Sequence, residues 1–200
     1  MAEPSVIDID RDGDVVITWH VEGGECSSPK LRVNSAVLAR GSPVFKAMLS
    51  ERFKEGHELT ANGVVEVPLC FDEAEGMTVI CNVLHLRNDH VSERVDLSLL
   101  EDVAKLADKY DCVKAMKHAA RAWLQIYLSD LRAKTLSPSP KALTAAYHFQ
   151  DARMINEIGE VLVLLADHDL RDQRGSHPLA LERLQGALHV SERSTQANKA

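Results

Sequence analysis

The sequence lacks any hydrophobic run long enough to cross a membrane. A membrane-spanning helix needs about 20 consecutive apolar residues, and the sequence contains no such run. The first residues, from Met1 onward, are acidic and lack the basic start and the apolar middle of a secretory signal peptide. We therefore expect no membrane partner, and we expect a cytoplasmic or nuclear protein.

Cysteine is scarce and is not arranged as metal sites usually are. The four cysteines form no CxxC pair: Cys26, Cys70, Cys81 and Cys112. Cys81 lies four residues before His85, and Cys112 lies near His118. Two such pairs fall short of a four-ligand zinc site. We expect reduced thiols that act as small apolar residues, with no metal and no disulfide.

Positive charge is also in deficit, because 23 basic side chains face 30 acidic ones and the formal net charge is -7. A negative protein repels the phosphate backbone, so nucleic acid is not the expected partner. Five basic residues do gather early in the sequence, as charge runs on solvated faces often do: Arg32, Arg40, Lys46, Arg52 and Lys54.

Motifs of catalysis are missing as well. The sequence has no GxSxG, no HExxH and no glycine-rich phosphate loop. His148, and His168 between Asp167 and Asp169, could act as bases, but no recognisable nucleophile accompanies them. We expect a protein that is not an enzyme and binds no cofactor.

Three segments have the composition of strands. Residues 14–21 are rich in β-branched and aromatic side chains and end at the turn residues Gly23 and Gly24, and 31–33 can return antiparallel to them. Residues 64–69 predict a third strand, in which Pro68 favours an edge. The apolar content of 45% is sufficient for a real core.

The remaining apolar residues recur at helical spacing. Helices are predicted over 34–40, halted by Gly41, then over 42–52, 73–87, 98–110 and 113–127. Ser42 and Pro43 have the cap and first-turn chemistry of a helix start, and Ser98 with Glu101 has the spacing of a capping box. Four residues on these apolar stripes are predicted to share one core: Phe45, Leu84, Leu106 and Trp123.

The ends of the chain differ from this central part. Residues 1–13 are non-periodic and are expected to be flexible, so the folded domain is placed at 14–130. Two prolines, Pro138 and Pro140, predict a linker over 131–140. A helical extension over 141–190, including a last helix over 179–190, and a disordered tail from 191 are expected to follow.

Several short segments of the sequence resemble motifs of the BTB/POZ family. Asp14-Val-Val-Ile, and the run from Val33 through Ser42-Pro-Val-Phe45 to Leu49, resemble the segment that joins the second strand of that fold to its first two helices. The runs Leu84 to Asp89 and Leu106 to Cys112 are similar to the fungal branch of the family. The resemblance spans residues 10–128 and implies an α+β fold: a small three-stranded sheet capped by a cluster of helices, followed by a helical C-terminal extension.

The resemblance also implies a function, namely a protein-interaction module that forms homodimers and recruits other proteins. Some members are substrate adaptors for cullin-type ubiquitin ligases, and the alternative is a scaffold for transcriptional regulators. The implied dimer interface contains Val37, Val44, Ala47 and Met48. The implied partner surface contains Arg87, Asn88, Asp89, His90 and Glu93. Asp14 occupies the position of the aspartate that lies in the family's charged pocket. In many members a histidine and a following basic residue begin the first helix, and here those two positions hold Asn34 and Ser35.

Overall fold

The computed structural model describes residues 5–21, 24–25, 28–70, 73–133 and 135–174. By its contacts the chain divides into a first unit, Met1–Gly159, and a second unit, Glu160–Ala200. The second unit is described only as far as residue 174, where it continues the last helix, with Val163 and Leu164 exposed. All of the surfaces considered below belong to the first unit.

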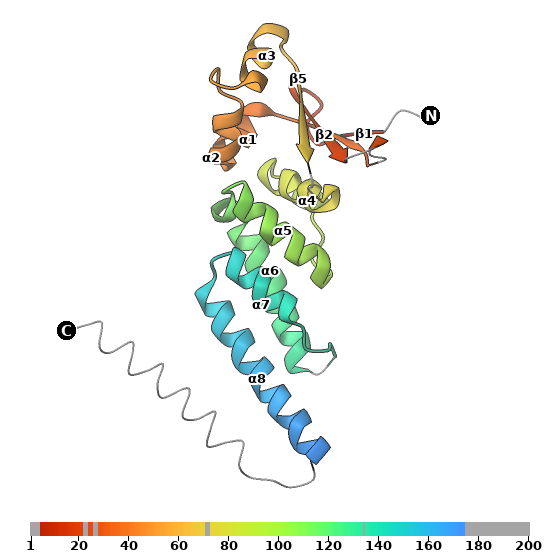
Figure 1. The fold of residues 1–200 in the computed structure, drawn as a ribbon, viewed down its shortest axis with the longest axis vertical. Coiled ribbons are helices and arrows are strands. Elements are labelled where there is room, and N and C mark those ends of the chain that lie inside the picture. Colours follow the sequence, from red (N-terminus) through yellow and green to blue (C-terminus); the bar gives the residue numbers. More distant parts are fainter. Residues whose placement is uncertain (1–4, 22–23, 26–27, 71–72, 134, 175–200) are drawn as a thin grey trace, which may run out of the picture. The chain divides into compact units, whose positions relative to one another are not determined.

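The sheet is built around strand β2, Val15–Val21. On one side β2 pairs antiparallel with β4, Lys30–Val33, and on the other it pairs parallel with β5, Val65–Cys70. β1, Val6–Asp8, pairs parallel with β4, and the short β3, Gly24–Glu25, pairs antiparallel with the end of β2. Figure 1 shows these strands together at one end of the first unit. The predicted hairpin of β2 and β4 is confirmed, and β5 pairs only with β2 among the described strands, as Pro68 favours.

The predicted strand count is wrong, because the sheet has five strands instead of three. The two additional strands are very short, and neither has the alternating pattern by which a strand is read from sequence. Residues 1–13 were expected to lie outside the folded domain, yet Val6–Asp8 form β1 within them. Pairing with β4 supplies the hydrogen bonds that this segment could not form alone.

One face of the sheet is apolar across three strands and forms part of the core. Ile17 of β2 stands between Leu31 of β4 and Val67 of β5 in the strand register. All three side chains are at most 2% exposed. Because side chains alternate across a strand, this row fixes which face of the sheet points to the helices.

Two short helices follow β4 and a third precedes β5. They are α1, Ser35–Gly41, α2, Pro43–Met48, and α3, Lys54–Asn62. The sequence predicts no helix over α3, because this segment is polar, and in the structure its buried residue is Gly56. Gly41 lies in the last turn of α1, where a Cβ atom would come within 2.5 Å of Leu84 Cδ2. Glycine at this position therefore allows α1 to pack closely against Leu84 of α4, while the cap that ends α1 is Ser42.

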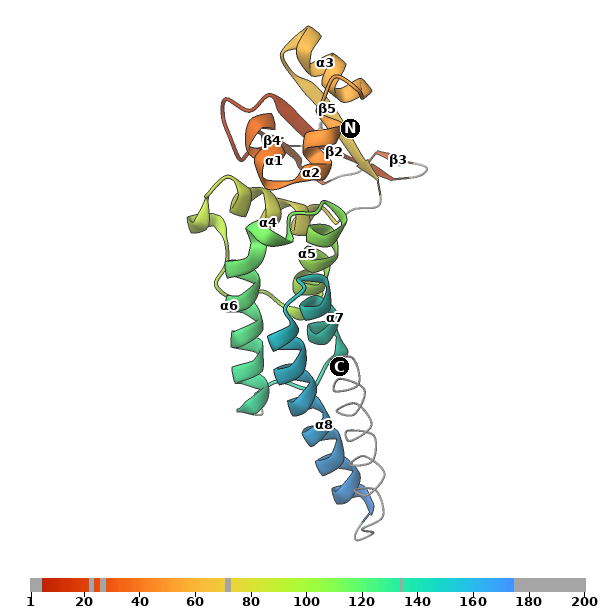
Figure 2. The same cartoon turned by 90° about the vertical axis from the view of Figure 1, so that its left-hand side faces the viewer.

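The remaining helices follow β5 in the sequence. They are α4, Ala74–Leu84, the single 3-10 turn η1, Asn88–His90, then α5, Leu97–Lys109, α6, Val113–Arg132, α7, Pro140–His148, and α8, Ala152–Arg174. α5 contacts α4, α6 and α7, and Figure 2 shows α5, α6 and α7 side by side. Mixed strands and helices make this an α+β fold.

Two details of these helices differ from the sequence prediction. α5 is capped by Asp96, whose carboxylate accepts the N–H groups of Ser98 and Leu99. The predicted capping box at Ser98 is therefore wrong, and the cap lies two residues earlier. α4 ends at Leu84, and Leu84 is only half-buried. Phe45, Leu106 and Trp123 are at most 5% exposed, so three of the four predicted core residues lie in the interior.

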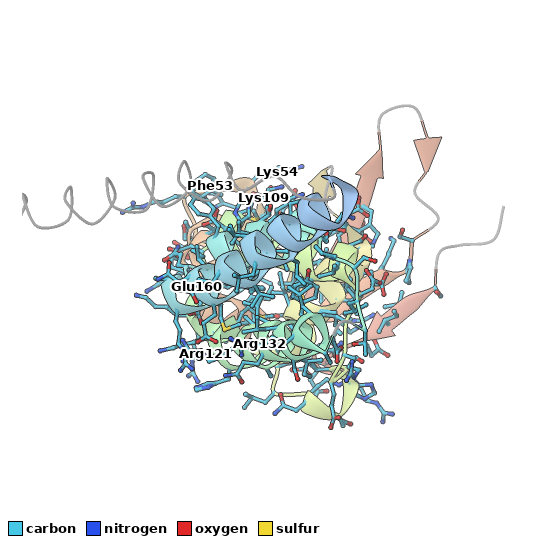
Figure 3. The ribbon with its side chains drawn as sticks, turned by 90° about the horizontal axis from the view of Figure 1, so that it is seen from below. Phe53, Lys54, Lys109, Arg121, Arg132 and Glu160 are labelled. Atoms are coloured by element: carbon cyan, nitrogen blue, oxygen red, sulfur yellow. The ribbon has the colours of Figure 1, made fainter. Side chains whose placement is uncertain are left out.

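The predicted linker does not separate two units. After it, α7 packs on α5, and the side chains of α6 bind the residues that follow α7. Arg121 donates to Asp151 at 2.8 Å, and Arg132 reaches Glu157 at 3.4 Å; Figure 3 labels both arginines. Burial alone would raise the pKa of Asp151, but hydrogen bonds from Arg121 and Met154 outweigh it and lower that pKa.

The predicted helix over 179–190 and the tail from 191 lie outside the described residues.

Candidate interaction surfaces

The segments 33–49 and 106–112, far apart in the sequence, meet in the core. The hydroxyl of Ser42 accepts the N–H of Phe45 at 3.0 Å and donates to the carbonyl oxygen of Tyr110. The ring of Phe45 stacks on the ring of Tyr110, with centroids 4.6 Å apart and planes 4° from parallel. One serine thus caps α2 and joins it to the end of α5. The predicted helix start at Ser42 and Pro43 is confirmed.

Asp14 has a local partner. Its carboxylate accepts the N–H of Ser35 at 2.7 Å and the hydroxyl of Ser35 at 2.6 Å. Asp14 therefore anchors the first residue of α1 to the start of β2. The neutral hydroxyl of Ser35 occupies a place where the family resemblance implied a charged pocket.

His85 links the end of α4 to the start of α1. Its Nε2 accepts the N–H of Asn34 at 3.0 Å, and its Nδ1 lies 2.8 Å from the carbonyl oxygen of Cys81. A backbone N–H can only donate, so Nε2 carries no proton and Nδ1 is the donor. Burial lowers the pKa of His85, the hydrogen bond to Cys81 and the charge of Asp10 oppose that shift, and Arg87 adds to it. The imidazole is therefore held neutral.

The implied dimer residues lie on the outer side of α1 and α2. Ala47 is exposed, while Val37, Val44 and Met48 are half-buried. We call these four residues the α1–α2 face. Phe45, by contrast, is 1% exposed and belongs to the core. The α1–α2 face is thus apolar in composition and remains in part accessible.

The implied partner surface is a short segment that includes η1. Asn88, Asp89, His90 and Glu93 are exposed. Arg87 has a different role, because its Nη1 donates to the carbonyl oxygen of Asp8 at 2.9 Å and its Nη2 lies 2.7 Å from His90 Nε2. Arg87 ties the segment to β1, so replacing it would disturb the fold as well as the surface.

An open groove, which the sequence did not predict, lies between the sheet and the helices. Its volume is about 1100 Å³. Strands contribute Ile7, Trp19 and Leu69, and α4 contributes Thr78, Val79 and Asn82. The segment before α5 contributes Ser92 and Val95, and the first turn of α5 contributes Leu99. Asn82 interrupts an otherwise apolar run in α4, and that interruption is the one sequence signal that could have indicated the groove.

Two of the four expected thiols are buried. Cys81 and Cys112 are free and inaccessible. Burial raises the pKa of Cys81 far above its ordinary value and that of Cys112 to about 12. His85 contacts the carbonyl oxygen of Cys81. No cluster of three or more potential metal ligands occurs in the described part of the chain, and Cys26 lies outside it.

The histidines considered as bases occupy different settings. His148 Nδ1 lies 3.0 Å from Asp108 Oδ2, in a pair that joins α7 to α5. His168 lies in α8, and the side chains around it are outside the described set. Some of the early basic residues bind carboxylates, Arg32 with Asp8 at 3.1 Å and Lys54 with Glu58 at 3.4 Å.

Comparisons add no relative: no family model matches the sequence, and no curated protein matches it. Among the described helices, none is both long enough and apolar enough to span a bilayer.

Proposed function

We propose that this chain is a protein-interaction module of the BTB/POZ type, which pairs with a second copy of itself and recruits other proteins. The observation that carries the proposal is the junction of Ser42, Phe45 and Tyr110. Two segments far apart in sequence, each resembling the same family, bind one another there. The order of the elements, from a hairpin through two short helices and a parallel strand to a helical stack, is consistent with this proposal.

The α1–α2 face is the proposed self-association surface. Apolar side chains that remain in part accessible, as those of this face do, often mark an interface. In a twofold dimer the same surface meets its own copy, so one set of residues is sufficient for both sides. We expect an interface near the lower part of the standard range of about 1,200 to 2,000 Å², which dilution should dissociate.

Light scattering over a concentration series tests this proposal. The full chain should rise from 22.1 kDa toward twice that mass as its concentration increases. Ala47→Asp places a charge on the exposed centre of the face and should hold the protein at the monomer mass. Ala115→Asp, at an exposed position of α6, is the matched control and should dimerise normally. A wild-type mass that stays at the monomer value would refute self-association.

Recruitment of a cullin is the more specific proposal, and it concerns Asn88 to Glu93. Asp89 and Glu93 are exposed acidic residues on this segment. A pull-down with a purified cullin should succeed with the full chain and fail with Asp89→Lys and Glu93→Lys together. Arg87 is kept, since it binds β1. If no cullin binds the full chain, the alternative proposal is a scaffold for transcriptional regulators.

We place this activity in the cytoplasm or the nucleus. The observation that favours this location is the pair of buried free thiols, Cys81 and Cys112. Reducing compartments keep thiols in this form.

A further inference from the structure

The groove beside α4 has the form of a site for an extended protein segment. Apolar side chains line it from the sheet, from α4 and from α5: Trp19 and Leu69, Val79, and Leu99. Small-molecule sites usually enclose about 300 to 1,000 Å³. The groove is open and has a volume of about 1100 Å³, so a chain passing through fits it better than a compact ligand.

A buried polar group at the groove has no partner. Asn82 lines the groove and is 6% exposed, and its Oδ1 makes no hydrogen bond with the described residues. Buried acceptors in native proteins are nearly always hydrogen-bonded. Such an acceptor can take a donor from a ligand once the Asn82 side chain turns it toward the groove, and the main-chain N–H of a peptide is such a donor.

The charges of the groove favour a basic occupant. Glu73 and Glu75, at the start of α4, line it and make no ion pair within the described residues. The charges at the other side are already engaged: Arg94 binds Asp130 at 2.6 Å, and the carboxylate of Asp96 caps α5. The net charge available to a ligand is therefore negative, at the α4 end.

The walls are formed before any ligand arrives. The indole N–H of Trp19 donates to the carbonyl oxygen of Pro29 at 2.8 Å, which fixes the ring that lines the groove. The indole N–H of Trp123 donates to the carbonyl oxygen of Ser92 at 2.9 Å, which holds the segment before α5 against α6. Walls that are ordered in advance reduce the conformational entropy that binding would otherwise remove.

We propose that the groove binds an extended segment of a partner protein that inserts a large apolar side chain over Trp19, donates an N–H to Asn82 Oδ1 and directs a basic residue to Glu73 and Glu75. The groove shares no residue with the α1–α2 face. Loss of dimerisation and loss of peptide binding are therefore separate results, and this site does not depend on the proposed self-association.

Selection from a phage library of random linear peptides, with the immobilised full chain as bait, supplies the probe. The enriched peptides should contain a large apolar residue together with Lys or Arg. One of them, synthesised with a fluorescent label, is then titrated with the protein. Asn82→Leu keeps the branched shape of the side chain but removes the acceptor, and Glu75→Lys reverses the charge. Each should weaken binding by about tenfold or more.

Matched controls separate the groove from general effects. Asn156→Leu and Glu51→Lys make the same changes at exposed positions that do not line the groove, and each should leave the affinity within about twofold. In nuclear magnetic resonance spectra, the indole N–H signal of Trp19 should shift as the peptide is added. Failure to enrich any peptide, enrichment of acidic peptides, or binding that is insensitive to Asn82→Leu and Glu75→Lys would each overturn the proposal.

Discussion

Replacing Ser42 by alanine is the sharpest test of the contact between α2 and α5. The Ser42 side chain is fully buried and has two hydrogen-bond partners, the N–H of Phe45 and the carbonyl oxygen of Tyr110. Loss of a helix cap costs about 0.5 to 2 kcal/mol, and a buried group that loses its hydrogen bond costs about 1 to 3 kcal/mol. We therefore expect Ser42→Ala to lower the free energy of unfolding by about 2 to 4 kcal/mol.

Urea denaturation followed by circular dichroism measures this change. Ser50→Ala is the matched control, because the Ser50 hydroxyl also donates to a backbone carbonyl, that of Ala47, but in an exposed setting. The control should stay within about 0.5 kcal/mol of the wild type. If Ser42→Ala were as stable as Ser50→Ala, the contact between α2 and the end of α5 would not exist as described.

Three further substitutions have predicted outcomes. Phe45→Ala should cost about 3 to 5 kcal/mol in urea denaturation, and Leu84→Ala clearly less because Leu84 is half-buried; equal costs would contradict this packing. Because the pKa of His85 is lowered in the folded state, the unfolded chain binds its proton first. The contribution of His85 to the free energy of unfolding should therefore be complete above the ordinary pKa of about 6.5 and should decrease as the pH falls below that value. Denaturation at several pH values measures this decrease, and His85→Gln should remove part of it. Asn82→Leu should raise the melting temperature, since it removes an acceptor without a partner; a large drop would mean that the carboxamide is satisfied in solution.

Structural features that depend on neighbouring residues could be predicted from the sequence. Ser42 and Pro43 predicted a helix start because a cap and a first-turn proline act within a few residues. The hairpin of β2 and β4 was readable because alternating apolar residues select one face of a sheet. The α+β class follows from these elements.

Features that depend on distant contacts were not readable. Val6–Asp8 form a strand by pairing with β4. A segment of three residues carries no pattern that identifies this pairing partner. The sequence placed Leu84 in the core, but Leu84 is half-buried and the fully buried side chains of α4 are Met77, Ile80 and Cys81. The groove could not be located from sequence either, since strands, α4 and the segment before α5 line it together.

Hydrogen–deuterium exchange at two protein concentrations tests the central claim, that the chain is an interaction module which pairs through α1 and α2. At high concentration the amides of residues 35–48 should exchange more slowly than at low concentration, while those of α3, residues 54–62, should exchange at the same rate in both samples. In Ala47→Asp the difference at residues 35–48 should disappear. Equal exchange at the two concentrations throughout the wild-type chain, or protection confined to segments outside α1 and α2, would contradict the account.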